Sequence, residues 1–142
     1  MTKDEGREKY KCPSSIGYLK EDIMGEFTLG VFPSLVGSMS LDFAFKLADA
    51  GIAKGHKVNM WLSGNAVMMA KKGQKAFKDY SHNEKLMKEL MGKGMEITVC
   101  EACAEARGYH KEDVPEGMKR ASMDWYLAKT VKTDKLLHIG GE

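Results

Sequence analysis

Short apolar runs alternate with helical segments along most of this chain, and this alternation constrains its fold more than any other feature. The runs suited to buried strands cover residues 26–32, 57–62, 95–99 and 135–139. The segments with helical spacing of apolar residues lie between them, at residues 41–52, 86–91 and 123–131. Strands separated by helices over this length predict an α/β fold with a mainly parallel sheet and helices on both faces.

The chain divides into two parts of different character. Residues 1–25 carry many charges and few apolar side chains, and Pro13 and Gly17 interrupt any periodicity. We interpret them as an N-terminal arm or a poorly ordered extension. Residues 26–142 then form one domain, because a chain of 142 residues is long enough for a single packed core.

Charge, hydropathy and cysteine content restrict the partners and the location. The net charge is +2, and the 22 basic and 20 acidic residues are interspersed, so we expect no direct binding of nucleic acid. The apolar runs are shorter than a membrane span, and no hydrophobic segment follows the charged N-terminus, so neither a membrane partner nor a secretion signal is predicted. The three cysteines are too few and odd in number for a disulfide framework. They fit the reducing cytoplasm, which we predict as the location.

Cys100 is the first candidate for chemistry, since it stands where the strand of residues 95–99 gives way to a helix. Unpaired N–H groups at a helix start favour a thiolate, and the pKa of such a cysteine can fall well below the free value of about 8.5. Parallel strands bring their carboxyl ends to one edge of the sheet. The loops after the first two strands therefore supply candidate lining residues for the same site: Pro33, Ser34, Gly64 and Asn65.

The segment after Cys100 resembles a known family. Cys100 is followed seven residues later by Arg107 and then Gly108, and this spacing at a strand-to-helix junction resembles the active-site segment of the DsrE/DsrF/TusD-like sulfurtransferases. Weaker similarities lie at residues 55–58, at residues 112–113 and at residues 122–123. The resemblance covers roughly residues 26–139.

The resemblance implies a three-layer α/β/α domain with a mainly parallel sheet of about five strands, assembled into a homo-oligomer such as a trimer or a hexamer. It implies that Cys100 accepts sulfane sulfur as a persulfide and passes it on without a cofactor. A TusA-like sulfur-carrier protein is then the expected donor or acceptor, in sulfur oxidation or in tRNA thiolation. Arg107 and Gly108 become candidate lining residues, although an arginine near a helix end more often binds the last carbonyls.

Aromatic residues point to the same assembly. Phe43, Phe45, Trp61 and Trp125 are difficult to place together inside one small domain. We therefore expect some of them to lie in contacts between subunits.

Cys103 adds a second thiol and leaves the function open. The simplest family members have a small residue at this position, so Cys103 is either a filler or a redox partner of Cys100. The pair makes a Cys-x-x-Cys motif, which also fits a thiol-disulfide redox protein. A third candidate is a non-catalytic module that binds a small ligand or a metal. One Cys-x-x-Cys provides only half of a zinc site, so no metal site is predicted.

Overall fold

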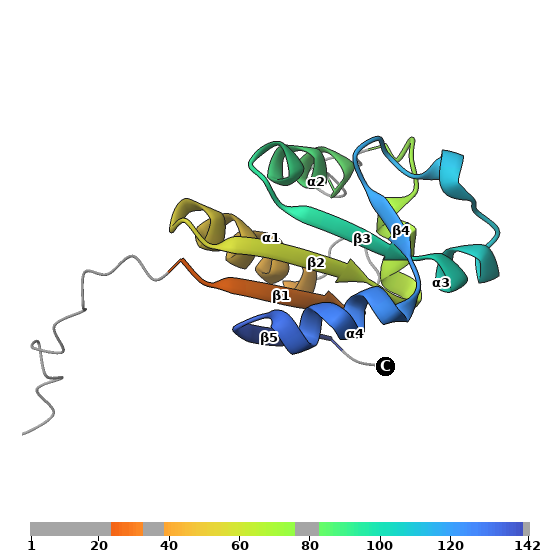
Figure 1. Ribbon diagram of the computed structural model, residues 1–142. Helices are drawn as coiled ribbons and strands as arrows, with labels where there is room; N and C mark the ends of the chain where they lie inside the picture. Colours follow the sequence, from red (N-terminus) through yellow and green to blue (C-terminus); the bar gives the residue numbers. More distant parts are fainter. Residues whose placement is uncertain (1–23, 33–38, 76–82, 141–142) are drawn as a thin grey trace, which may run out of the picture.

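A five-stranded parallel sheet forms the centre of the computed structural model, which describes residues 24–32, 39–75 and 83–140 (Figure 1). The strands are β1 (Glu26–Val31), β2 (Lys57–Leu62), β3 (Glu96–Cys100), β4 (Lys119–Ala121) and β5 (Lys135–Ile139). They are ordered β4-β3-β2-β1-β5, and each neighbouring pair is parallel. The predicted α/β class and the parallel sheet are therefore confirmed.

Helices cover both faces of this sheet. The α-helices are α1 (Met39–Ala53), α2 (Asn83–Gly92), α3 (Glu101–Ala106) and α4 (Met123–Lys132), and the 3-10 helices are η1 (Gly64–Ala70) and η2 (Lys111–Asp113). Figure 1 shows α1 and α2 behind the sheet and α4 in front of it. This arrangement is the expected three-layer α/β/α architecture. The segments η1 and α3 follow the carboxyl ends of β2 and β3 and contact each other there.

The structure differs from the sequence-based expectation in three places. The strand β3 includes Cys100, one residue beyond the predicted strand. The edge strand β4 was not predicted, because two of its three residues are charged and it carries no apolar pattern. Of the predicted extension, residues 1–23 lie outside the described residues. Gly25 already belongs to the start of the sheet, since its carbonyl accepts a hydrogen bond from the Lys57 amide.

The two faces of the sheet bury different side chains. Leu29, Met60 and Ile97 belong to the core on the side of α1 and α2. On the other side the Trp61 ring stacks on Trp125 and Tyr126 of α4, with centroid distances of 5.7 and 5.5 Å. Trp61 is fully buried, and Phe45 is also in the core. Of the aromatic residues expected at subunit contacts, only Phe43 is more than half exposed, at 58%.

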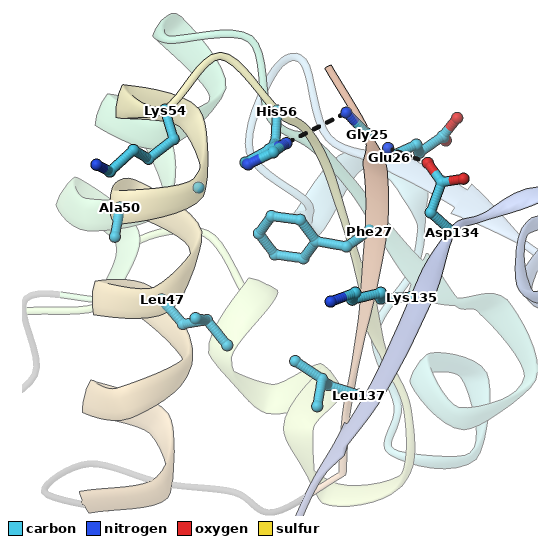
Figure 2. A pocket seen from close by; sticks show the side chains of 11 residues that line it. Gly25, Glu26, Phe27, Leu47, Ala50, Lys54, His56, Asp134, Lys135 and Leu137 are labelled. Atoms are coloured by element: carbon cyan, nitrogen blue, oxygen red, sulfur yellow. Dashed lines mark hydrogen bonds between the residues drawn. The ribbon is translucent and has the colours of Figure 1, made fainter. Parts of the chain in front are cut away.

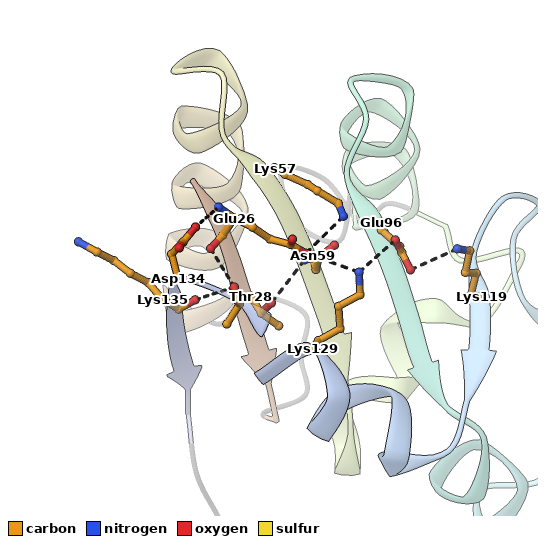
Figure 3. A network of polar contacts seen from close by, with 10 residues as sticks. Glu26, Thr28, Lys57, Asn59, Glu96, Lys119, Lys129, Asp134 and Lys135 are labelled. Carbon is orange, nitrogen blue, oxygen red and sulfur yellow. Dashed lines mark hydrogen bonds and ion pairs between the residues drawn. The ribbon is translucent and has the colours of Figure 1, made fainter. Parts of the chain in front are cut away.

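A polar network holds the carboxyl-terminal end of α4 over the amino-terminal ends of the strands (Figure 3). The ammonium group of Lys129 lies 3.5 Å from the Glu26 carboxylate of β1 and 3.7 Å from the Glu96 carboxylate of β3. Asn59 of β2, between them, donates a hydrogen bond to Glu26. Lys129 thus bridges two carboxylates on the strands that flank β2. With the Trp61 stack, these contacts fix α4 across three strands.

Candidate active site

Two thiols lie at the carboxyl edge of the sheet. Cys100 is the last residue of β3, and Cys103 lies one turn later in α3. Ser63 and Gly64 follow the end of β2, which pairs with β3. The predicted meeting of the loops after the second and third strands is therefore observed. Pro33 and Ser34, the candidates from the loop after the first strand, lie outside the described residues.

Cys103 lies against the turn that follows β2. The Gly64 N–H donates to its Sγ atom at 3.4 Å, and the Ser63 hydroxyl lies 3.6 Å from the same sulfur. Gly64 has a φ of 57°, in the left-handed region that glycine adopts without strain. The turn after β2 thus brings a backbone donor and a buried hydroxyl to one thiol.

These contacts make Cys103 the more acidic thiol of the pair. Partial burial opposes ionisation, but hydrogen bonds from Cys100, Ser63 and the Gly64 N–H, together with the positive charge of Arg107, hold the pKa of Cys103 below its ordinary value. A larger fraction of Cys103 is therefore thiolate at neutral pH than of a free cysteine.

Cys100 has the opposite environment. Its side chain is 4% exposed, and burial raises the pKa of its thiol, as does its hydrogen bond to Cys103. The expectation that a helix start lowers the pKa of Cys100 is therefore wrong. The backbone N–H of Cys103, in the six-residue helix α3, and the Ser63 hydroxyl favour the Cys100 thiolate, but the burial of Cys100 outweighs them. Its thiol instead belongs to the buried end of the sheet.

Arg107 connects the end of α3 to the loop after β2. Its guanidinium donates to the Cys103 carbonyl at 3.1 Å and to the Asn65 side chain at 2.8 Å. The expected structural role is thus observed, because Arg107 binds a carbonyl of the short helix. Its charge also acts on the Cys103 thiol. Gly108 has a φ of 76° and turns the chain away from α3.

Tyr109 is a supporting residue that sequence reasoning missed. Its side chain is fully buried, and its hydroxyl donates a hydrogen bond to the Val67 carbonyl of η1. Burial raises its pKa to about 12, so the hydroxyl stays protonated and remains a donor. Tyr109 therefore holds η1 against the segment that follows α3, and with it the turn that carries Ser63 and Gly64. A tyrosine directly after Arg107-Gly108 is the signal that was available in the sequence.

A groove of about 560 Å³ lies between α1 and β5, away from the thiols (Figure 2). Phe27, Leu47 and Leu137 form its apolar wall, and Lys54 and His56 lie toward one end. The groove includes Gly25 and Glu26 at the amino end of β1, whereas the thiols lie at the carboxyl end of β3. It is therefore not part of the thiol site.

Two kinds of feature are absent from the described parts of the chain. Among residues 24–32, 39–75 and 83–140, no group of three or more His, Cys, Asp or Glu side chains is arranged to hold a metal ion. Within the same ranges, no helix has both the length and the apolar character needed to cross a bilayer.

Known structures share this architecture. The ychN protein of E. coli superposes with a TM-score of 0.75 at 21% identity, over 82% of this chain and 100% of that one. The protein MTH1491 of Methanobacterium thermoautotrophicum superposes with a TM-score of 0.69 at 12% identity, over 80% of this chain and 98% of that one. At these identities the similarity establishes the fold.

Sequence comparison extends the similarity to the family level. The uncharacterized protein MJ0989 of Methanocaldococcus jannaschii is 30% identical over 112 residues, which cover 79% of this chain and 97% of that protein. The sequence profile of the DsrE/DsrF-like family matches residues 33–139, which include β2, β3 and both thiols of the site. With the fold and this match in agreement, the chain belongs to the DsrE/DsrF-like family.

Proposed function

We propose that this protein is a sulfurtransferase that accepts sulfane sulfur and passes it on as a cysteine persulfide held by Cys100. The observation that carries the proposal is the contact of a partly exposed, hydrogen-bonded thiol, Cys103, with a buried thiol, Cys100. Thiolates take sulfur from persulfides by the same exchange chemistry that rearranges disulfides. This reaction needs no cofactor, because each step only moves one sulfur atom between thiols.

The burial of Cys100 suits a carrier. A persulfide on a side chain that is 4% exposed is shielded from other thiols and from oxidants until a partner arrives. Cys100 also occupies the position of the active cysteine in the resemblance to the DsrE/DsrF/TusD-like sulfurtransferases. We place the reaction in the cytoplasm, with a TusA-like sulfur-carrier protein as donor or acceptor, in sulfur oxidation or tRNA thiolation.

Exposure of the protein to polysulfide tests this proposal. Intact mass and peptide mapping under non-reducing conditions should show the gain of a sulfur atom on the peptide that contains Cys100 and Cys103. Cys12 is the third cysteine and belongs to the predicted N-terminal extension, so the Cys12→Ser variant should gain the sulfur equally. The double variant Cys100→Ser/Cys103→Ser should not gain it. Equal gain by the double variant would contradict the assignment. Loss of both thiols to a disulfide, with no gain of sulfur, would instead favour a thiol-disulfide redox protein.

We also propose that the exposed side of α4 is covered by a second copy of the chain. Met123, Leu127 and Val131 recur every fourth residue and are 54%, 53% and 85% exposed, so they form one apolar stripe on the helix. The homo-oligomer implied by the resemblance would bury this stripe.

Replacing Leu127 by glutamate is therefore expected to lower the molar mass found by light scattering, because a charge in an apolar contact is costly. Leu86→Glu is the control, since Leu86 is also exposed, at 37%, and belongs to α2, which lies on the opposite face of the sheet from α4. A monomeric wild-type protein at low concentration would contradict the proposed assembly.

A further inference from the structure

We propose that sulfur first binds to Cys103 and is then passed to Cys100, so that Cys103 is the attacking thiol and Cys100 the storage thiol. This order rests on the proposed persulfide function and deepens it. It assigns the two cysteines of one site to successive steps and makes Ser63 and Gly64 part of the first step.

Access is the first argument for this order. Cys103 is partly exposed, whereas Cys100 is 4% exposed at the end of β3. A persulfide or polysulfide that approaches from solvent therefore meets Cys103 first. Direct attack by Cys100 on a donor in solvent would require the buried Cys100 sulfur to become more exposed.

The hydrogen bonds of the site are the second argument. The Gly64 N–H, at 3.4 Å, and the Ser63 hydroxyl, at 3.6 Å, both act on the Cys103 sulfur. Arg107 adds a positive charge nearby, and the pKa of Cys103 is lowered while that of Cys100 is raised. The nucleophile in sulfur exchange is the thiolate, and the site stabilises the thiolate of Cys103.

The first step transfers sulfur from the donor. The Cys103 thiolate attacks the outer sulfur of a donor persulfide, R–S–SH. A sulfur–sulfur bond forms at Cys103, the bond between the two donor sulfurs breaks, and the donor leaves as the thiolate R–S⁻. The product is a Cys103 persulfide, Cys–S–SH, and no external oxidant or reductant takes part.

The second step moves the same sulfur inward. The Cys100 sulfur attacks the outer sulfur of the Cys103 persulfide, and the bond to the Cys103 sulfur breaks. The proton of the Cys100 thiol goes to the Cys103 sulfur, along the hydrogen bond that already joins the two groups. The site then holds a Cys100 persulfide and a free Cys103, with no net oxidation.

Single variants separate the two steps. In Cys103→Ser, the initial rate of sulfur gain from polysulfide should fall about tenfold or more, because the accessible thiolate is missing. In Cys100→Ser, this rate should stay within about twofold of the wild type, but the sulfur remains on Cys103. A small thiol should then remove the sulfur from this variant faster than from the wild-type protein. In the wild-type protein, tandem mass spectrometry should place the sulfur on Cys103 early and on Cys100 later.

The outcomes distinguish this order from the persulfide function itself. Sulfur gain by Cys103→Ser at the wild-type rate, with the sulfur on Cys100, would overturn the order and leave the persulfide function standing. Absence of sulfur gain in every protein, the wild type included, would overturn both. Cys103→Ala is a second variant without a hydroxyl, and equal thermal midpoints by circular dichroism verify that each variant is folded.

Discussion

Replacing Trp61 by alanine is expected to lower the free energy of unfolding by about 3–5 kcal/mol, as for other large aromatic side chains removed from a core. Trp61 is fully buried, and its ring stacks on both Trp125 and Tyr126. The substitution therefore removes the contact between α4 and the centre of the sheet and leaves a cavity. Urea denaturation followed by circular dichroism measures the change.

Two variants control this prediction. Trp125→Ala removes the same side chain at a partly buried position and should cost less than Trp61→Ala. Trp61→Phe should also cost less, because a ring still fills most of the space. The Trp61→Phe variant also removes the indole N–H of Trp61, which is buried without a partner among the described residues. A larger loss for Trp125→Ala than for Trp61→Ala would show that the core on this face is assigned wrongly.

Alkylation by iodoacetamide is expected to modify Cys103 well before Cys100, and the difference should grow as the pH falls toward neutrality. The reacting form is the thiolate, so the rate of each thiol falls about tenfold per pH unit below its pKa. The pKa of Cys103 is lowered, so its alkylation rate begins to fall at a lower pH than that of a free cysteine. Burial raises the pKa of Cys100, so its alkylation rate begins to fall at a higher pH than that of a free cysteine. Peptide mass mapping over a pH series reads out both residues.

A charge variant tests the cause of this profile. In Arg107→Gln the pKa of Cys103 should rise, and the decline of its rate should begin at higher pH, because the positive charge that favours the thiolate is gone. Lys132→Gln removes one positive charge at the exposed end of α4 and should leave the profile unchanged. Faster alkylation of Cys100 than of Cys103 across the pH range would refute the described environments.

The sequence predicted most of the fold because the buried elements have strong periodic patterns. Strands such as residues 57–62 are apolar along their length, and helices such as residues 41–52 repeat apolar residues on one face. The strand β4 has neither property, since it is short and charged and is a strand only because β3 offers an unpaired edge. Its existence depends on a neighbour far away in the chain.

The sequence located the candidate site but did not show which of its two thiols is the more acidic. The strand-to-helix junction and the spacing of Cys100, Arg107 and Gly108 placed the thiols at the carboxyl edge of the sheet, and the rule for parallel strands brought Gly64 and Asn65 to the same edge. These are properties of local pattern and topology, which a single sequence contains.

Only the tertiary structure decided which thiol is the more acidic. Burial and hydrogen bonding depend on segments that are distant in sequence: Gly64 lies 39 residues before Cys103, and the Asn65 partner of Arg107 lies 42 residues before it. The sequence by itself determined the α/β fold, the carboxyl-edge site and the pair of cysteines. In the folded chain the pKa of Cys103 is lowered and that of Cys100 is raised, contrary to the expectation for Cys100, because a pKa is set by the solvent, charges and donors that surround a group in space.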